Sequence, residues 1–338
     1  MAKATILTEP KRQSYSIMAA NLRRTLRRTG VAVVVRRLPS SGREREATAR
    51  ACAGQVVFHS TIGPLFAPID GCVNVALPHH EWSRYPSGWA QRLNRFDAVW
   101  TASRFVARVL RACGVAAPVS FVPPALDLES IPRKSGWTAR RPFRFLACGE
   151  PHFRKGFHLL IAGFLEAFPK TGKATLTIKT SPACAWDSPR ADIEIVARRL
   201  SRPSLLAMYR SFDACASASL GEGLDLPAAE AILAGLPVVM NRWGGRGDLL
   251  APGAHVDVAY RVMDEPFASQ PSYYAAGQQC AFSSPAQVAD ALRRTVEMTA
   301  AGRSRMAAAA RKHLIEVYGT QAASARLRRA WNALPHRA

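Results

Sequence analysis

Two glutamates separated by seven residues stand in the stretch LGEGLDLPAAEAILAGLPVVMNRWGG, which runs from Leu220 to Gly245. Glu222 lies in a loop between two glycines, and Glu230 lies in an alanine-rich stretch that has the composition of a helix. Ionised carboxylates only accept hydrogen bonds, so they are well suited to holding the hydroxyl groups of sugars. The spacing predicts that the two acids hold two separate sugar groups.

The residues around Glu222 predict a loop that can also approach a phosphate. Gly221 and Gly223 let the backbone bend tightly and come close to a ligand. Pro227 fits the first turn of a helix over 227–234. The N-terminus of such a helix attracts anions, so the same loop is expected to serve a sugar and a phosphate.

A basic pair, Arg154 and Lys155, stands just before Gly156 and a predicted helix over 157–168. A guanidinium and an ammonium group at the start of a helix suit a diphosphate. Either motif alone occurs often by chance, but both follow a predicted strand, and they occur in a fixed order. Together they predict a site for a sugar that carries a diphosphate.

Strands and helices alternate along the chain, and this alternation would position the two motifs. We predict strands over 4–8, 31–38, 54–60, 72–77, 96–103, 119–127, 143–150, 174–180, 213–219 and 237–243. We predict helices over 14–30, 104–114, 157–168, 202–212, 227–234, 285–302, 304–318 and 320–334. The continuous β-branched run in 31–38 indicates a strand buried on both faces of a parallel sheet.

The composition becomes polar, basic and proline-bearing around 127–142, which predicts a linker. We expect an N-terminal Rossmann-like domain over 1–135 and a second one over 140–317, with a helix at about 318–336 packing back on the first. Alternating strands and helices predict an α/β protein of two doubly wound domains that face a cleft. Ligands of such sheets bind at the carboxyl ends of the strands, where both motifs lie.

The charge of the chain predicts an anionic partner. The net charge is +22 over 338 residues, and the first fifty residues carry twelve basic and three acidic side chains. Part of this excess is typical of arginine- and alanine-rich chains without a binding role, but such a balance also attracts nucleic acid, anionic lipid and phosphorylated substrates. The helix over 14–30 presents Arg23, Arg24, Arg27 and Arg28 away from its apolar stripe and could dock on such a surface.

Other classes of protein fit the composition poorly. No apolar run approaches the roughly 20 residues that span a bilayer. The seven cysteines are scattered without a CxxC pair, so we expect neither a disulfide framework nor a zinc site. The N-terminal residues lack the apolar core of a signal peptide, so we expect a cytoplasmic protein, or one bound peripherally to the inner face of the membrane.

The motifs resemble those of the retaining GT-B glycosyltransferases of family 4, the group 1 glycosyltransferases. EGLDLPAAE matches the family's Glu-x7-Glu motif, AGLPVV and GG follow it, and RKGFHLLIAGF is similar to its basic helix start. The resemblance covers roughly residues 70–335. EPKRQSYS replaces the glycine-rich loop that follows the first strand in the family, and Glu150 stands where an arginine is frequent, so Arg154 takes the phosphate role.

The resemblance implies a role for each residue of the two motifs. Glu230 would hold the ribose hydroxyls of a nucleotide sugar, and Glu222 would hold hydroxyls of the transferred sugar. Arg154 and Lys155 would stabilise the departing diphosphate, so neither a metal nor another cofactor is expected. The sugar and phosphate would also meet four backbone amides, those of Gly223, Leu224, Asp225 and Leu226.

The loop PHHEWSRYP offers a histidine to the reacting sugar, as a histidine of the first domain does in the family. His79, His80 or Glu81 could take this place. The two histidines are adjacent and point in different directions, so at most one is expected in the site. A polar loop that packs through its tryptophan is an equally good interpretation.

Three functions are compatible with these observations. The first is retaining transfer from a nucleotide sugar to a cell-surface glycan or lipid-linked acceptor, with the basic domain on an anionic membrane. The second is glycosylation of a modified base in DNA, with the arginines on phosphates and the base flipped out. The third is a non-catalytic, basic nucleic-acid-binding protein, which would need neither the glutamates nor the RKG motif.

Overall fold

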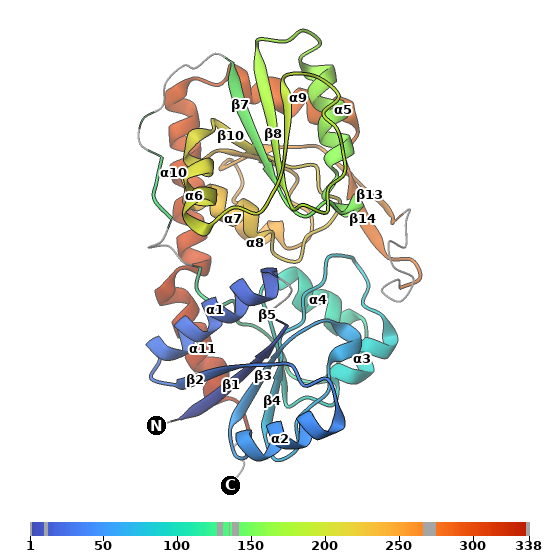
Figure 1. Ribbon diagram of the computed structural model, residues 1–338, viewed down its shortest axis with the longest axis vertical. Coiled ribbons are helices and arrows are strands. Elements are labelled where there is room, and N and C mark those ends of the chain that lie inside the picture. The colour runs from blue at the N-terminus through green and yellow to red at the C-terminus, as the bar shows by residue number, and fades with distance from the viewer. Residues whose placement is uncertain are drawn as a thin grey trace. The chain divides into compact units, whose positions relative to one another are not determined.

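The computed structural model describes residues 2–9, 13–126, 131–134, 136, 142–265 and 275–335, without the side chain of Gln13. Most of the predicted linker over 127–142 therefore lies outside the described residues. The chain divides into two units, of which the first comprises 1–127, 270–278 and 315–338 and the second comprises 128–269 and 279–314 (Figure 1). Each unit is built around its own parallel sheet.

The first sheet has six strands in the order β2-β1-β3-β4-β5-β6, all parallel. Its strands are β1 (Lys3–Thr8), β2 (Ala32–Arg37), β3 (Val56–Ser60), β4 (Val73–Ala76), β5 (Ala98–Thr101) and β6 (Val119–Phe121). The helices of this unit are α1 (Gln13–Arg28), α2 (Gly42–Cys52), α3 (Ser87–Leu93), α4 (Arg104–Ala112) and α11 (Thr320–Asn332), with a short 3-10 turn, η1 (Gly63–Leu65).

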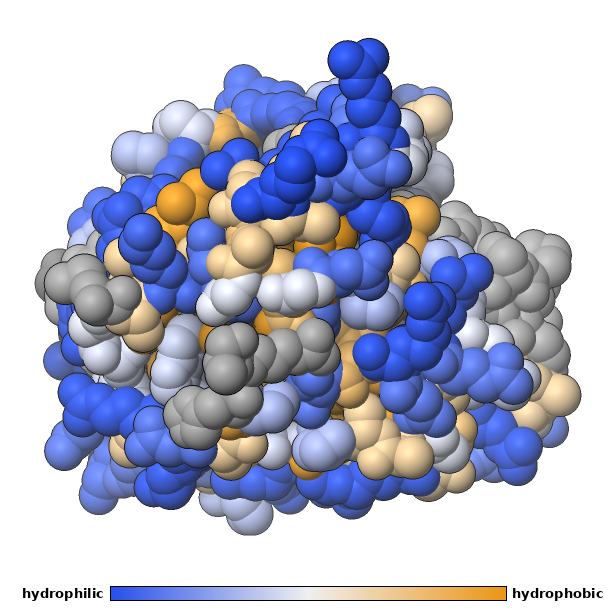
Figure 2. Space-filling model, turned by 90° about the horizontal axis from the view of Figure 1, so that it is seen from below, coloured by the Kyte–Doolittle hydropathy of each residue, from blue (hydrophilic) through white to orange (hydrophobic). Residues whose placement is uncertain are grey.

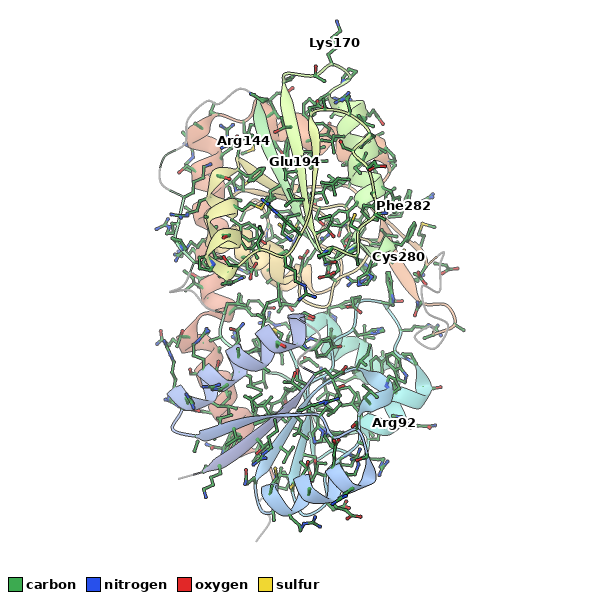
Figure 3. The ribbon with its side chains drawn as sticks, viewed as in Figure 1. Arg92, Arg144, Lys170, Glu194, Cys280 and Phe282 are labelled. Carbon is green, nitrogen blue, oxygen red and sulfur yellow. The ribbon has the colours of Figure 1, made fainter. Side chains whose placement is uncertain are left out.

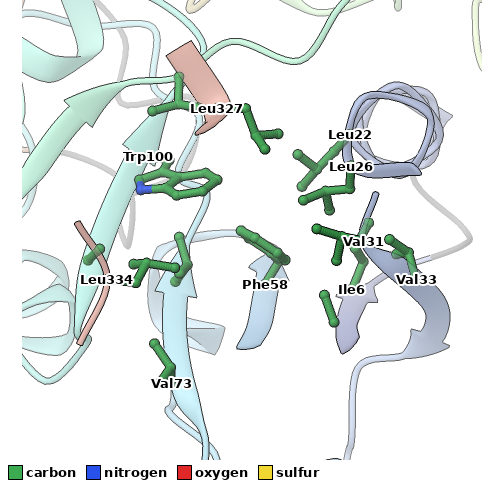
Figure 4. Packing of buried hydrophobic residues seen from close by; sticks show 14 of the residues in the cluster. Ile6, Leu22, Leu26, Val31, Val33, Phe58, Val73, Trp100, Leu327 and Leu334 are labelled. Atoms are coloured by element: carbon green, nitrogen blue, oxygen red, sulfur yellow. The ribbon is translucent and has the colours of Figure 1, made fainter. Parts of the chain in front are cut away.

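Successive side chains along the strands point to opposite faces of this sheet, and helices pack on both faces. On one face Ile6, Phe58 and Trp100 pack with Leu22 of α1 and Leu327 of α11 (Figure 4). On the other face, neighbouring strand residues pack with α2, α3 and α4. The two-sided cover makes the sheet doubly wound, as its strand and helix order predicted.

The prediction that the strand over 31–38 is buried on both faces is wrong. The strand is β2, which ends the sheet and, among the described strands, pairs only with β1. Val33 is buried, but Val34 is 51% exposed and Val35 is 38% exposed. A run of β-branched residues favours a strand at the centre or at the edge of a sheet. Whether its side chains are buried depends on the neighbouring elements, which the run does not predict.

The second sheet also has six parallel strands, in the order β12-β11-β10-β7-β8-β9. They are β7 (Phe143–Cys148), β8 (Ala174–Thr180), β9 (Ile193–Ala197), β10 (Ala214–Ala216), β11 (Val238–Met240) and β12 (Val256–Asp257). Around it lie η2 (Phe153–Lys155), α5 (Phe157–Ala167), α6 (Arg202–Ser211), α7 (Leu226–Leu233), α8 (Arg246–Leu249) and α9 (Pro285–Glu297). Helix α10 (Ala300–Tyr318) contributes to both units.

An antiparallel pair, β13 (Arg261–Asp264) and β14 (Gln279–Phe282), extends the second unit. Figure 3 labels Cys280 and Phe282 on β14, and the amide of Ala281 between them donates to the carbonyl of Leu220 at 2.8 Å. This bond ties the pair to the loop that carries Glu222. The sequence did not predict this pair, nor α2, α3, α8, β9 and β12.

Candidate functional site

The loops after β7 and β10 meet at the carboxyl edge of the second sheet, so the basic pair and the first glutamate lie together. The amide of Leu220 donates to the carbonyl of Arg154 at 2.8 Å. Gly156 ends η2 in the left-handed region, with φ 62°, and a Cβ atom there would lie 2.1 Å from the carbonyl oxygen of Ala218. A glycine is therefore required for the two loops to approach this closely.

Glu222 is the centre of a buried ionic cluster. Its Oε2 lies 2.9 Å from Nη1 of Arg154, and its Oε1 lies 2.6 Å from Nζ of Lys155. The hydroxyl of Ser219 is within 2.8 Å of the same Oε1. The carboxylate is only 6% exposed, so these groups replace the water that would otherwise solvate it.

Burial alone would raise the pKa of Glu222, because a charged carboxylate is poorly solvated inside the protein. The charges of Arg154 and Lys155 act in the opposite direction and, with Arg246, hold its pKa well below the usual range. Glu222 is therefore ionised near pH 7. It can accept hydrogen bonds from hydroxyl groups, but it cannot act as a general acid.

The backbone after Glu222 presents unpartnered amides. Asp225 caps α7 with φ 69°, and its carboxylate accepts from the amide of Ala228 at 3.2 Å. Within the described residues, no acceptor lies in hydrogen-bond range of the amides of Gly223, Leu224, Asp225 and Leu226. These are the amides that the resemblance to family 4 implies as contacts of the sugar and phosphate, and α7 adds its N-terminal field to them.

The loop after β11 packs against the backbone of the loop that carries Glu222. The amide of Gly245 donates to the carbonyl of Glu222 at 2.7 Å. A Cβ atom on Gly245 would lie 2.0 Å from the carbonyl oxygen of Gly223, and one on Gly244 would lie 2.8 Å from that of Glu222. The GG pair of the sequence is thus a close backbone contact that fixes the position of Glu222.

Arg246 is a residue of the site that the sequence did not predict. Its guanidinium is 1% exposed and donates from Nε to Oδ2 of Asp225 at 2.7 Å. It also bonds the hydroxyl of Ser217 at 2.6 Å and approaches the carbonyl of Ser219. An arginine is rarely fully buried unless it is paired with an acid. The burial of Arg246 therefore could not be predicted from its place after GG, because only the fold brings Asp225 beside it.

Glu230 lies one turn into α7, and its side chain is 11% exposed. The hydroxyl of Tyr209 donates to its Oε2 at 3.2 Å, and Nη1 of Arg202 pairs with its Oε1. Burial raises the pKa of Tyr209 well above its usual value, so this hydroxyl keeps its proton. The side chain of Cys148, at the end of β7, lies close to this hydroxyl.

The two histidines of the first unit have different surroundings. Nε2 of His80 lies in contact with the carbonyl of Arg84, and the ring packs edge-on against Tyr85, so His80 fixes its own loop. Nε2 of His79 is buried beside a pocket of about 20 Å³, and it has no hydrogen-bond partner among the described residues. Burial lowers the pKa of His79, although Glu81 opposes the shift, so the imidazole is neutral near pH 7.

This pocket lies at the carboxyl edge of the first sheet, under α1. It is mostly apolar, with Met18, Leu22 and Trp100 among its walls, and Ser60 and Thr101 add hydroxyls. The hydroxyl of Ser60 is also buried, and no described residue forms a hydrogen bond with it. The volume is enough for one water molecule or a group of similar size.

Within the described ranges, no group of three or more histidine, cysteine or acidic side chains is arranged to hold a metal ion. In the same ranges, no helix has both the length and the apolar character that crossing a bilayer requires.

No family profile and no curated protein matches the sequence. Solved structures do match. HepE of Anabaena in complex with UDP and glucose is 13% identical, with a TM-score of 0.71 over 99% of this chain and 100% of its own. Sucrose-phosphate synthase of Thermosynechococcus elongatus is 13% identical, with a TM-score of 0.71 over 98% of both chains.

A third similar structure is an Escherichia coli protein, described as trehalose-6-phosphate bound with UDP-2-fluoro glucose. It is 10% identical, with a TM-score of 0.70 over 99% of this chain and 100% of its own. The likeness extends over the whole chain in all three cases and agrees with the two six-stranded parallel sheets. The chain therefore has the α/β fold of the GT-B class, as the sequence predicted.

Proposed function

We propose that the chain is a retaining glycosyltransferase, similar to family 4, that moves a sugar from a nucleoside diphosphate sugar to a hydroxyl acceptor. The observation that carries the proposal is the cluster of Glu222, Arg154 and Lys155 beside four unpartnered amides. It offers acceptors to a sugar and donors to a diphosphate within one edge of a sheet. Similar folds hold UDP in HepE and UDP-2-fluoro glucose in the E. coli structure.

Each part of the cluster has a role in this reaction. Arg154 and Lys155 turn from Glu222 toward the diphosphate and stabilise the negative charge that develops as the bond to the anomeric carbon breaks. Glu222 then accepts hydrogen bonds from the sugar. The amides of Gly223, Leu224, Asp225 and Leu226 hold the sugar and the phosphate, so no metal or other cofactor is needed for charge neutralisation.

The acceptor hydroxyl attacks the anomeric carbon from the side that the diphosphate leaves. Its proton passes to the departing phosphate oxygen, so no side chain acts as a nucleophile and the anomeric configuration is retained. His79, whose imidazole is neutral and whose Nε2 has no hydrogen-bond partner among the described residues, is the histidine of the first unit that fits a role at the reacting sugar. His80, which is in contact with the carbonyl of Arg84, fits that role less well.

The first unit offers the surface for an anionic partner. Helices α1 and α11 pack side by side, and neither contains an acidic residue. Arg23, Arg27 and Arg28 of α1 are exposed, as are Arg328 and Arg329 of α11. This face fits the headgroups of an anionic membrane that presents a lipid-linked acceptor, and we place the protein in the cytoplasm at that surface. The phosphates of DNA that carries a modified base are the alternative partner.

The experiment is a thermal-shift screen of nucleotide sugars, beginning with UDP-glucose, on the unaltered protein and on Glu230→Gln. One or more donors should raise the melting temperature of the unaltered protein, and the shift should largely disappear in Glu230→Gln. Glu297→Gln, which changes an exposed acid at the end of α9, is the matched control and should keep the shift.

The donor that binds is then incubated with candidate acceptors, and the anomeric configuration of the product is read by NMR. Inversion would refute retention alone. If no nucleotide sugar stabilises the protein while it binds DNA, the non-catalytic nucleic-acid-binding function is correct and the glycosyltransferase is not.

A further inference from the structure

The two oxygens of the Glu230 carboxylate have partners of different kinds. Oε2 accepts from Tyr209, whose side chain is fully buried and keeps its proton. This partner is fixed by the packing of α6 against α7. Oε1 is paired with Arg202, the first residue of α6, whose side chain is 39% exposed.

The difference in exposure decides which partner can move. A tyrosine that is completely enclosed cannot leave without opening the core, whereas a partly exposed arginine can turn into solvent. Ion pairs at that level of exposure contribute only about 0–1 kcal/mol, so the arginine is released easily. Yet Glu230 itself is 11% exposed, and a carboxylate so well enclosed is unfavourable without a partner.

We infer that Arg202 is a displaceable counter-ion of Glu230, which the ribose of the nucleotide replaces. The inference rests on the proposed function, in which Glu230 holds the ribose. In the free protein Arg202 keeps the carboxylate paired. On binding, a ribose hydroxyl donates to Oε1, Tyr209 keeps Oε2, and the guanidinium turns outward. Arg202 thereby sets the affinity for ribonucleotides by competing with them.

This competition predicts the sign of a change in nucleotide affinity. Removing the arginine leaves Glu230 without its competitor, so a ribose hydroxyl should bind more tightly. Arg202→Ala should raise the affinity for the ribonucleotide by about two- to fivefold, the range that corresponds to a partly exposed ion pair. Inorganic pyrophosphate has no ribose. Its affinity should therefore change only through the loss of one positive charge.

The experiment measures the binding of UDP, GDP, ADP and pyrophosphate by calorimetry to the unaltered protein, Arg202→Ala and Arg210→Ala. Arg210 lies exposed at the other end of α6, so its replacement removes the same charge from the same helix. The inference requires that Arg202→Ala binds the preferred nucleotide more tightly than Arg210→Ala, while the two variants bind pyrophosphate equally. A double-mutant cycle of Arg202→Ala with Glu230→Gln should show that the gain needs the carboxylate.

Two failures can be told apart. If Arg202→Ala binds the nucleotide as Arg210→Ala does, or more weakly, Arg202 is not a competitor and this inference is wrong, although the proposed function stands. If the unaltered protein binds none of the three nucleotides, the proposed function fails, and the inference fails with it.

Discussion

Individual side chains in both units show how burial determines chemistry. Glu222 and Arg246 are enclosed ions, and each is kept by opposite charge within hydrogen-bond distance. His59 is the opposite case, since it is enclosed but neutral. Its Nε2 lies 2.9 Å from Oδ1 of Asn74, an acceptor, so Nε2 carries the proton, and Nδ1 has no partner in the part of the chain that the structure describes.

His59 predicts a loss of stability in mild acid. Burial, against a smaller opposing effect of Asn74, lowers its pKa from 6.5 to about 4. As the pH falls, His59 is therefore protonated in the unfolded chain before it is protonated in the folded protein. Its contribution to the free energy of unfolding is complete above pH 6.5 and is lost as the pH falls toward 4. Over that interval the unaltered protein should lose about 3 kcal/mol more than His59→Gln, which keeps a donor for Asn74 but does not titrate.

The measurement is urea unfolding of both proteins at several pH values between 7 and 4.5. The two free energies of unfolding should approach each other as the pH falls. If they change in parallel, His59 titrates normally and its enclosure is not maintained in solution.

At the scale of elements, the site is a set of loops in backbone contact. Loops after β7, β10 and β11 touch through Gly156, Gly244 and Gly245, where side chains are excluded. The positions of Glu222 and of the neighbouring amides follow from these contacts. Rigid strands therefore set the site through the loops that end them.

Gly245→Ala should lower the affinity for the nucleotide sugar by an order of magnitude or more. The added Cβ atom would lie 2.0 Å from the carbonyl oxygen of Gly223, so the Glu222 loop must shift. An ångström of misplacement in such a site is expected to cost about a hundredfold in rate. Donor affinity and turnover are the measurements.

Gly247→Ala is the matched control, because its Cβ atom would meet, of the described atoms, only the carbonyl oxygen of Arg242, at 3.4 Å. This variant should keep nearly full affinity. Equal losses in both variants would show that α8 as a whole, and not the contact with Gly223, supports the loop.

Local sequence patterns predicted most of the strands and helices, but they did not predict which elements lie next to each other in the fold. The motifs around Arg154 and Glu222 were placed on loops after the correct strands, because glycine and helix-start signals are local. The edge position of β2, the antiparallel pair β13 and β14, and the burial of Arg246 depend on contacts between distant segments. Arg202 is a further case, because its pairing with Glu230 joins residues 28 positions apart.

At the scale of the whole molecule, charge is the dominant property. Hydrophilic residues prevail on the face shown in Figure 2, and hydrophobic ones form smaller areas among them. The net charge of +22 is distributed over both units, but α1 and α11 concentrate arginines without any acid. A polyanion should therefore bind to this face more strongly than to other basic helices of the same unit.

Replacing the three exposed arginines of α1, at 23, 27 and 28, by glutamine should weaken binding to vesicles that contain phosphatidylglycerol. Each arginine near such a surface contributes about 1 kcal/mol, so the partition coefficient should fall on the order of a hundredfold. Co-sedimentation at low and moderate salt measures it. The same variant on a DNA column tests the alternative partner through its salt dependence.

The control variant replaces Arg92, Arg95 and Arg108 by glutamine. Arg92 lies on α3 (Figure 3), Arg95 follows that helix and Arg108 lies on α4, which cover the other face of the same sheet. The net charge falls equally in both variants. Equal losses of vesicle binding would mean that total charge, and not the α1 face, determines association.

The terminal position of β2 has a consequence for how copies of the protein behave together. An open strand edge with exposed valines is a template on which another chain can aggregate. Here Arg36 and Arg37 complete the same strand, and both are exposed. Two such edges repel each other, so the strand resists self-association in dilute salt, and concentrated salt, which shortens the range of this repulsion to a few ångströms, removes the protection.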